Sequence, residues 1–440
     1  MRSARIDPQL QPFILHAMIT RITTNGYRCL RHVDQELSSF HVLIGPNASG
    51  KTSFLDTLGF LGRMVSDGVE AACEERSMDF RDLLWNRTGD SFELAVEASF
   101  PKELRTKLAG DYESIRYEVR IGPDERSNRP GVLEESAWLQ SKQPGKAPEQ
   151  RTLFPIDSFP PNSVFVRSNA SRLRVFSKAQ GGNDNYYVET RPRGKKSGRG
   201  SGWFPSIKLG PFKSTLANLP ADEDKFPVST WFKNLLSEGV SRIALNGLQL
   251  RRPSPVSRNR GFEPDGSNLP WVVHRLESKE NRRLYEWWIE HIQTALPELE
   301  NVSTRERPED RSRYLVLHYR GGLEVPSWVA SDGTLRLLAL TLLAYAPDFS
   351  RLCLIEEPEN GIHPKAAETV YQALSNVNGA QILLATHSPV VLGMADPSKI
   401  LCFRKTEQGA TDIVRGDLHP ALRDWKDTVN VGELYAGGVL

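Results

Sequence analysis

Apolar residues occur along the chain in a few short, unbroken runs, and this pattern is typical of strands buried on both faces. Three such runs cover residues 41–44, 352–355 and 382–385. Stretches with apolar residues at helical spacing follow the first two runs, over residues 53–65 and 364–377. We therefore expect an α/β fold, in which the last two runs form a β-α-β unit with a right-handed crossover.

A second pattern, alternation of apolar and polar residues, marks a different kind of sheet. It covers residues 92–96 and 117–121 and predicts antiparallel strands with one face in water. The β-rich segment 19–30 is predicted to pair with the strand at 41–44. Residues 122–162 are rich in Pro, Ser, Gly and charge, and are expected to be mostly loops. Further helices are expected at residues 231–238, 284–296 and 335–346.

Composition limits the compartment and the kinds of partner. The chain of 440 residues has a formal net charge of +2, so it lacks the global signature of a polyanion-binding protein. Its four cysteines lie far apart without a CxxC pair, which argues against a zinc site or a disulfide scaffold. No apolar run approaches the roughly 18 residues of a membrane helix. We expect a cytoplasmic protein with reduced thiols and no membrane partner.

One Gly-rich segment without aliphatic side chains, residues 191–200, carries a local positive charge. Its basic residues are Arg191, Arg193, Lys195, Lys196 and Arg199. Such a loop can contact the phosphate backbone of a nucleic acid. A solvated loop without a ligand is the alternative.

Between the first apolar run and its helix lies GPNASGKT, residues 45–52, which fits the phosphate-loop pattern G-x4-G-K-[ST]. In such a loop, backbone N–H groups and a helix N-terminus surround phosphate oxygens. Lys51 is expected to reach the β- and γ-phosphates of ATP, and the Thr52 hydroxyl to ligate Mg²⁺. Arg28, from the preceding turn, is either a nucleotide contact or a plain surface residue. The predicted nucleotide-binding residues are Gly45, Asn47, Ala48, Ser49, Gly50, Lys51, Thr52, Ser53 and Arg28.

Polar residues end the two later strands. Glu356 and Glu357 follow the run 352–355, and His387 follows the run 382–385. Open α/β sheets bind ligands at the carboxyl ends of their strands. We expect Glu356 to hold Mg²⁺, Glu357 to orient or deprotonate the attacking water, and His387 to hydrogen-bond the γ-phosphate. A solvent-facing acidic turn and a structural histidine are the alternatives.

A further motif, SDGT at residues 331–334, begins the expected helix 335–346. A helix start with serine and glycine is either an anion site or an ordinary N-cap. In their order, these motifs resemble those of the ABC-type ATPases. The segments ITRITTNGYRCL, IEEPENGIHP and ATHSP resemble the RecF-like and OLD-type ATPases of bacteria, which are relatives of the SMC and Rad50 heads.

The resemblance implies an α/β fold of the ABC-type P-loop ATPase head, with a mixed sheet, flanking helices, an antiparallel β-subdomain and a large inserted α+β region. It also implies that two heads close on two ATP molecules. Each signature motif would then contact the nucleotide of the opposite subunit. The implied signature residues are Ser331, Asp332, Gly333 and Thr334, and the implied interface loop contains Glu359, Asn360 and His363. The implied segments are an N-terminal extension (1–17), an ATPase N-lobe (18–122), an inserted loop-rich and helical region (123–324) and a C-lobe (325–440).

The chain departs from the family pattern in three places. The signature reads SDGT and not LSGGQ. Glu356 stands where many relatives carry aspartate, so slow hydrolysis is expected. No clear Q-loop glutamine is found, and Asn86 or Arg87 is the candidate for that position.

The resemblance predicts an ATPase that forms a homodimer or a higher homo-oligomer and controls a separate effector in bacterial anti-phage defence. Family members often act with a TOPRIM-type nuclease. The 53 residues after His387 are too few for that domain, so the effector is expected on another chain. Two alternatives remain: a RecF-like DNA-binding ATPase in repair without a dedicated effector, and a transporter ATPase subunit.

Overall fold

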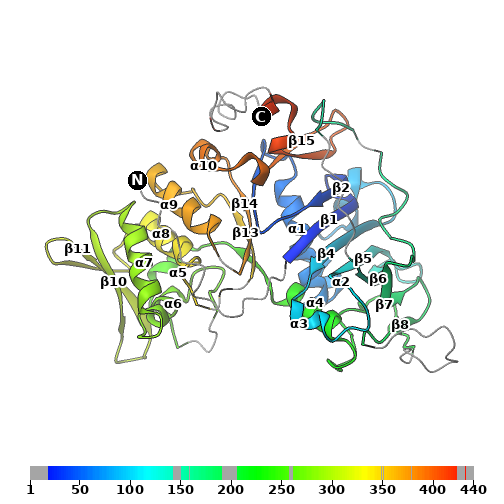
Figure 1. Ribbon diagram of the computed structural model, residues 1–440, viewed down its shortest axis with the longest axis horizontal. Coiled ribbons are helices and arrows are strands. Elements are labelled where there is room, and N and C mark those ends of the chain that lie inside the picture. The colour runs from blue at the N-terminus through cyan, green and yellow to red at the C-terminus, as the bar shows by residue number, and fades with distance from the viewer. Residues whose placement is uncertain are drawn as a thin grey trace.

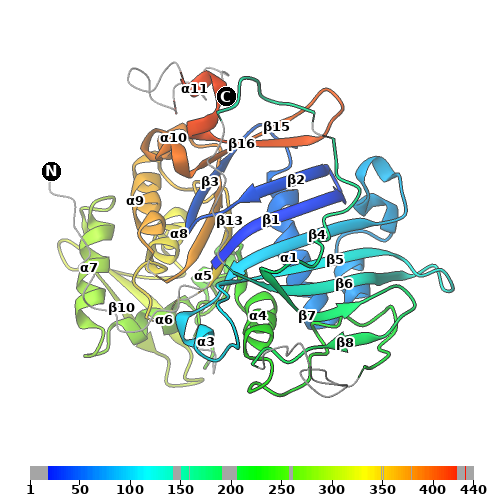
Figure 2. The same ribbon diagram turned by 45° about the vertical axis from the view of Figure 1, so that its right-hand side comes forward.

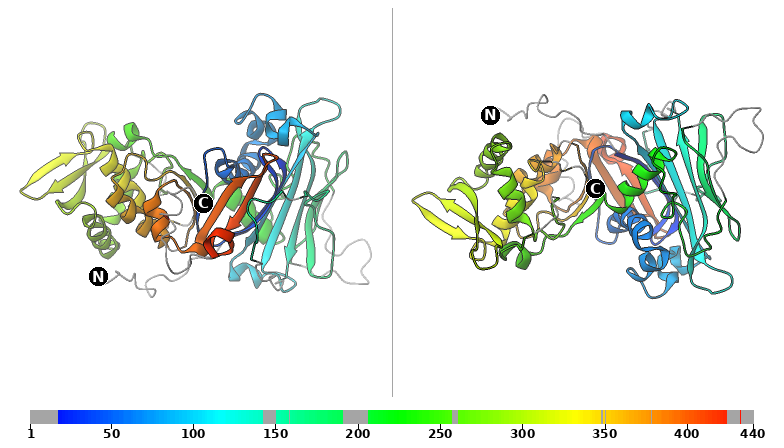
Figure 3. Two further views of the ribbon diagram at one scale, coloured as in Figure 1. Left: turned by 90° about the horizontal axis from the view of Figure 1, so that it is seen from above. Right: turned by 90° about the horizontal axis from the view of Figure 1, so that it is seen from below.

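The computed structural model describes residues 18–141, 150–157, 159–190, 206–256, 261–347, 349, 351–377, 379–423 and 432. Two large sheets run through the molecule, and helix α1 (Lys51–Asp67) packs between them (Figure 1). A third sheet, of three strands, lies at the end of the molecule away from the larger sheet (Figure 3). The molecule is therefore built in layers, with α1 at the centre of one core.

The six-stranded sheet has the order β16-β15-β3-β14-β13-β9 and is parallel except for β16. Its strands are β3 Phe40–Ile44, β9 Val240–Ile243, β13 Leu352–Glu356, β14 Gln381–Ala385, β15 Ile400–Lys405 and β16 Thr411–Arg415. Alternate residues of a strand face opposite sides. Leu43 therefore packs in the core that contains α1, whereas Val42 and Ile44 pack against helices on the other face. Both faces are buried, as the unbroken apolar runs predict.

The seven-stranded sheet has the order β2-β1-β4-β5-β6-β7-β8 and is antiparallel throughout. Its strands are β1 Met18–Tyr27, β2 Leu30–Glu36, β4 Phe92–Ser99, β5 Ser114–Pro123, β6 Pro130–Gln140, β7 Arg172–Lys178 and β8 Asp184–Tyr186. The predicted pairing of residues 19–30 with the strand at 41–44 is wrong. A tight turn after Tyr27 folds β1 onto β2, and the other edge of β1 meets β4. The neighbours of β3 are β14 and β15.

Strand β6 lies within residues 122–162, where the sequence predicted mostly loops, and that prediction is wrong for this stretch. The strand carries buried charge. Glu135 is fully buried, and burial raises the pKa of its carboxyl group while hydrogen bonds from neighbouring donors oppose the shift. The donors to Glu135 are Tyr117, Ser214, Thr215 and Leu216. Charged residues that are satisfied inside a sheet give the composition of a loop, and this masked the strand.

Helices α8 (Asp332–Leu342), α9 (Pro364–Ser375) and α10 (Pro389–Met394) pack on the face of the six-stranded sheet away from α1 (Figure 1). The helices predicted from spacing are confirmed as α1, α4, α7, α8 and α9, with ends that differ by a few residues. The remaining elements are α2 Val69–Glu74, α3 Lys102–Arg105, α4 Pro227–Ser237, α5 Gly247–Arg251, α6 Leu269–Leu276, α7 Arg282–Gln293, β10 Leu299–Glu306, β11 Arg313–Tyr319, β12 Leu323–Pro326 and α11 Pro420–Arg423.

The segment 123–324 contributes to several layers. The seven-stranded sheet continues through β6, β7 and β8, past residue 122 where a boundary was predicted. Strand β9 then joins the six-stranded sheet beside β13. The helices α6 and α7 and the strands β10 and β11 pack in the core beyond α8. Within the described ranges, no helix is both long and apolar enough to cross a membrane.

Candidate nucleotide-binding site

The phosphate-binding loop joins β3 to α1 and requires glycine at two positions. Gly50 has a φ of 108°, and a Cβ atom there would lie 2.2 Å from Oγ1 of Thr411. Gly45 has a φ of 148°, and its Cβ atom would lie 2.2 Å from the carbonyl oxygen of Phe403. Phe403 and Thr411 belong to β15 and β16, the hairpin that lies beside β3 (Figure 2). The loop therefore lies directly against this hairpin.

The side chain of Lys51 closes the loop on itself. Its Nζ atom donates to the carbonyl oxygens of Gly45 at 2.6 Å and Pro46 at 3.0 Å. Burial lowers the pKa of Lys51, while the charges of Glu357 and Glu356 act in the opposite direction. The ammonium group therefore lies under the loop, where phosphate oxygens would replace weaker carbonyl partners.

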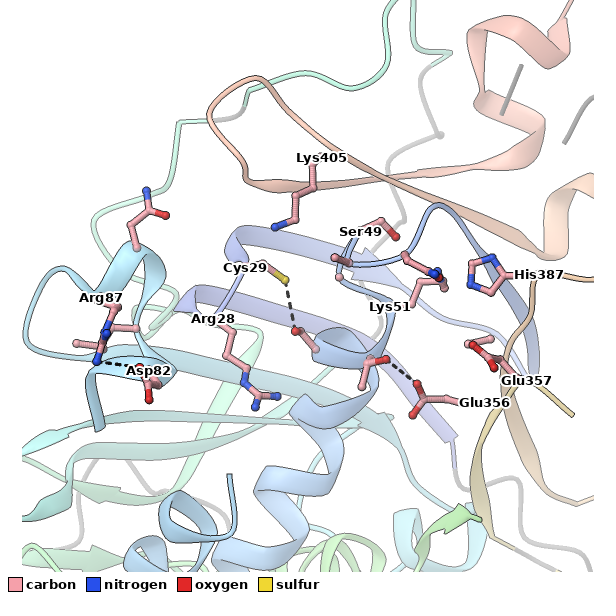
Figure 4. Close-up of a pocket in the computed structure, with 18 residues that line it drawn as sticks. Arg28, Cys29, Ser49, Lys51, Asp82, Arg87, Glu356, Glu357, His387 and Lys405 are labelled. Atoms are coloured by element: carbon pink, nitrogen blue, oxygen red, sulfur yellow. Dashed lines mark hydrogen bonds and ion pairs between the residues drawn. The ribbon is translucent and has the colours of Figure 1, made fainter. Parts of the chain in front are cut away.

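A cavity of about 440 Å³ opens over the loop (Figure 4). All the predicted nucleotide-binding residues except Gly45 line it, and so do Glu356, Glu357 and His387. In Figure 4, the two glutamates and His387 stand at one end of the cavity, and Asp82 and Arg87 at the other. Several wall residues had no predicted role: Cys29, Asp82, Leu84, Ala385 and Lys405. Cys29 and Ala385 lie within the segments ITRITTNGYRCL and ATHSP, whereas nothing in the sequence marks Asp82 and Lys405.

Thr52 and Glu356 meet at the carboxyl end of β13. Oγ1 of Thr52 donates to Oε2 of Glu356 at 2.6 Å. The other carboxylate oxygen, Oε1, accepts from Nη2 of Arg242 at 2.6 Å. A hydroxyl and a carboxylate beside an open cavity suit the small, hard Mg²⁺ ion, which prefers a few oxygen ligands and keeps several waters. Arg242 belongs to none of the motifs, and no feature of the sequence predicted its contact with Glu356.

Glu357 is held in a strained backbone conformation. Its φ is 48°, and its amide donates to the carbonyl oxygen of Ala385 at 2.7 Å. Its carboxylate accepts from Nδ2 of Asn360 at 2.5 Å. The chain leaves β13 at this residue, so the two neighbouring carboxylates have different surroundings. Glu356 accepts from Thr52 and Arg242, whereas Glu357 accepts from Asn360.

Glu359 holds the end of the neighbouring strand. Its Oε1 atom accepts from Oγ1 of Thr386 at 2.7 Å and from the amide of His387 at 2.9 Å. Burial, together with the charge of Lys51, lowers the pKa of the His387 imidazole, which favours its neutral form. A residue expected at a subunit interface thus contacts the histidine segment of its own chain.

Backbone strain is concentrated at this cavity. Seven described non-glycine residues have a positive φ, and five of them line its wall. Each such conformation costs about 1–3 kcal/mol and persists only where its surroundings impose it, commonly at functional sites. The five are Arg28, Ala48, Asn86, Arg87 and Glu357. This evidence for a functional site is independent of the sequence motifs.

Arg28 is fixed against α1. Its Nη1 atom donates to Oδ2 of Asp56 at 3.0 Å, and Asp56 also accepts from the Tyr27 hydroxyl at 2.7 Å and from Nε of Arg76 at 2.9 Å. Since Asp56 lies one turn after Thr52, the pair holds the arginine beside the phosphate loop. Arg28 therefore belongs to the cavity wall, although it is also part of a local ion-pair network.

The signature segment lies elsewhere on the chain's surface. Oγ of Ser331 accepts from the amide of Thr334 at 3.1 Å and caps α8, and Nε of Arg336 pairs with Asp332 at 2.7 Å. A Cβ atom on Gly333 would lie 2.4 Å from the carbonyl oxygen of Gly361. The segment thus packs on the loop after Glu357, but residues 331–334 do not line the cavity of their own chain.

Two further predictions concern His363 and the basic residues of segment 191–200. His363 caps α9, since its Nδ1 atom accepts from the amide of Lys365 at 3.2 Å. The basic residues predicted to contact nucleic acid, Arg191, Arg193, Lys195, Lys196 and Arg199, lie outside the described residues.

Comparisons with known proteins give a family for the sequence and a fold for the structure. A family model described as "AAA domain, putative AbiEii toxin, Type IV TA system" matches residues 40–393. A Smc head bound to the C-winged helix domain of ScpA is 14% identical, with a TM-score of 0.50 over 90% of this chain and 97% of that one. A Smc head with an extended coiled coil, bound to the C-terminal domain of ScpA derived from Pyrococcus furiosus, is also 14% identical, with a TM-score of 0.50 over 93% of this chain and 99% of that one. No curated protein matches the chain. The predicted fold class, a mixed α/β ABC-type ATPase head, is confirmed.

Proposed function

The chain belongs to the AAA-domain family that its sequence matches, and from that premise we propose that it binds ATP with Mg²⁺ and hydrolyses it. The observation that carries the proposal is the 2.6 Å contact between Thr52 and Glu356. It joins the end of the phosphate loop to the acidic end of a strand 304 residues later in the chain. A Gly-rich turn alone would not need that partner.

Each residue of the site has a physical role in this proposal. The loop amides and Lys51 bind the phosphates, and Thr52 with Glu356 holds Mg²⁺. When bound, Mg²⁺ would neutralise charge on the β- and γ-phosphate oxygens. Glu357, held by Asn360, orients or deprotonates the attacking water. His387 in its neutral form donates a hydrogen bond to the γ-phosphate.

Two heads act together in this proposal. Residues 331–334 stand at a helix N-terminus, which attracts anions, yet they lie outside the cavity of their own chain. The residues just before them, Trp328 and Val329, are large apolar side chains with exposed fractions of 49% and 66%. A second copy would cover this surface and place its γ-phosphate at Ser331. Two chains assembled in this way would form a homodimer with two composite sites.

The output of the dimer is control of a separate effector protein. The family description names a toxin of a Type IV TA system, which supports a role in bacterial defence. The solved Smc heads are bound to domains of another protein, ScpA, which supports a head that works through a protein partner. A nuclease is the effector that the family resemblance favours.

The proposed function is tested by nucleotide binding and turnover on the purified chain. Calorimetry should show binding of ATP with Mg²⁺, and phosphate release should follow slowly. Light scattering after gel filtration should show a monomer without nucleotide and a dimer of Glu357→Gln protein with ATP. A chain that binds no nucleotide would contradict the proposal.

A further inference from the structure

Arg242 contacts the residue proposed to hold Mg²⁺. It lies on β9, the edge strand of the six-stranded sheet, in register with Leu354 of β13. Alternate residues of a strand share a face, so Arg242 and Glu356 project from the same side of the sheet as Leu354. The guanidinium Nη2 atom lies 2.6 Å from Oε1 of Glu356.

This contact leaves neither oxygen of Glu356 without a donor. Thr52 donates to Oε2, and Arg242 donates to Oε1. The exposed fraction is 25% for the Glu356 side chain and 61% for that of Arg242. The carboxylate is therefore partly buried, and its arginine partner can move into solvent with little disturbance of the core.

Arg242 approaches Glu356 from a second cleft. This cleft has a volume of about 500 Å³, and Thr52, Glu356 and Arg28 line both it and the nucleotide cavity. Arg242 lines only the second cleft. Thr52 and Glu356 thus form a partition, with the nucleotide side open to metal and nucleotide and the other side occupied by a guanidinium group.

We propose that Arg242 competes with Mg²⁺ for the carboxylate of Glu356 and so sets the magnesium concentration at which the site is loaded. This rests on the proposed function, since it takes Glu356 as a metal ligand. An arginine cannot lose its proton at physiological pH, so its charge always opposes a cation placed on the same carboxylate. Arg242 is a positioning residue: it acts on the metal through Glu356 and does not touch the nucleotide cavity.

The test compares Arg242→Ala with Arg63→Ala in binding assays that need no turnover. Arg63 lines the same second cleft, but its ion-pair partners are Asp67 and Glu75 rather than Glu356. A non-hydrolysable ATP analogue is titrated at several Mg²⁺ concentrations, and with EDTA. The magnesium concentration for half-maximal binding should fall about fivefold in Arg242→Ala, because a neighbouring positive charge is removed. It should stay unchanged in Arg63→Ala.

Two further variants separate charge from shape. Arg242→Lys keeps the positive charge and loses the planar fork, so its half-maximal magnesium concentration should lie near that of the unaltered chain. In a Glu356→Gln background, Arg242→Ala should have no further effect, because the shared carboxylate is gone. Electron paramagnetic resonance of Mn²⁺ in place of Mg²⁺ counts bound metal directly.

The possible failures are distinguishable. If the unaltered chain binds no analogue with or without Mg²⁺, the proposed function fails, and this inference fails with it. If the analogue binds but Arg242→Ala needs the same or a higher magnesium concentration, the inference alone is overturned. Thermal melting followed by circular dichroism confirms that the variants are folded before they are compared.

Discussion

Helices α1 and α8 both begin beside residues proposed to contact phosphate, but they differ in whether a side chain caps their first N–H groups. No side chain caps α1, whose N-cap residue is Gly50. At the start of α8, Ser331 satisfies the amide of Thr334 with its own hydroxyl oxygen. The first N–H groups of a helix have no partner within the helix. Those of α1 therefore remain available to a ligand, whereas one of those of α8 is already used.

The side chains around the two helix starts also differ, and those around α1 form the better site for a ligand within one chain. Around α1, strands from distant parts of the chain bring a lysine, two glutamates and a histidine to one cavity. Around α8, Asp332 pairs with Arg336, and Ser331 is exposed. The side chains around the α1 start all come from one chain, whereas we propose that the α8 start contacts a nucleotide only in a second chain. Because the two helix starts differ, we expect ATP binding and ATP hydrolysis to be affected by different mutations.

The largest effect is expected from Glu357→Gln. It removes the group that orients or deprotonates water and keeps the phosphate cradle, so ATP binding should persist while turnover falls about a thousandfold. Single-turnover phosphate release measures the loss. Glu368→Gln, an exposed change on α9, should retain the rate and serves as the matched control. Unchanged turnover in Glu357→Gln would remove Glu357 from the mechanism.

Lys51→Ala should strongly weaken ATP binding at the start of α1. The ammonium group donates two hydrogen bonds within the loop and would donate to phosphate oxygens in the complex. Loss of these charge-assisted bonds should weaken ATP binding about a hundredfold. Calorimetry provides the measurement, and Arg63→Ala is the charge-matched control outside the cavity. Equal affinity of Lys51→Ala and the unaltered chain would refute the assignment of the loop.

Ser331→Arg should affect only the α8 end. Its side chain points from an exposed helix start, so ATP binding by one chain should be unchanged. A bulky group at the proposed interface should weaken the ATP-dependent dimer about tenfold or more. Sedimentation of a Glu357→Gln background with ATP detects the dimer. Ser331→Ala should weaken the dimer less than Ser331→Arg, because it removes the cap without adding bulk.

The smallest effect concerns pH. Burial and the charge of Lys51 lower the pKa of His387 from its ordinary value of 6.5, so the imidazole is mostly neutral at pH 6.5 and above and gains most of its charge at lower pH. The value of kcat/KM, which reports the free enzyme, should therefore change severalfold only below pH 6.5. His387→Gln should lack this change. An inflection above pH 6.5 that disappears in His387→Gln would contradict the lowered pKa.

The core of the nucleotide site was predictable because its signals are local. A buried parallel strand is apolar on both faces, and the loop and acidic pair follow such strands directly. The seven-stranded sheet gave weaker signals, since β6 carries Glu135, and three of the donors to this residue come from residues 214–216. The contact of Arg242 with Glu356 could not be predicted, because it depends on the register of β9 against β13. The wall formed by Asp82 and Lys405 depends likewise on packing between distant segments.

The central claim is that an active site combines the cavity of one chain with the α8 start of another, and a mixing experiment tests it most directly. Glu357→Gln protein keeps its signature segment and lacks a working cavity, while Ser331→Arg protein keeps its cavity and lacks a usable signature segment. A mixed dimer contains one intact composite site. We predict that the mixture hydrolyses ATP well above the average of the two separate rates. A rate equal to that average, or full activity from monomeric Ser331→Arg protein, would contradict the account.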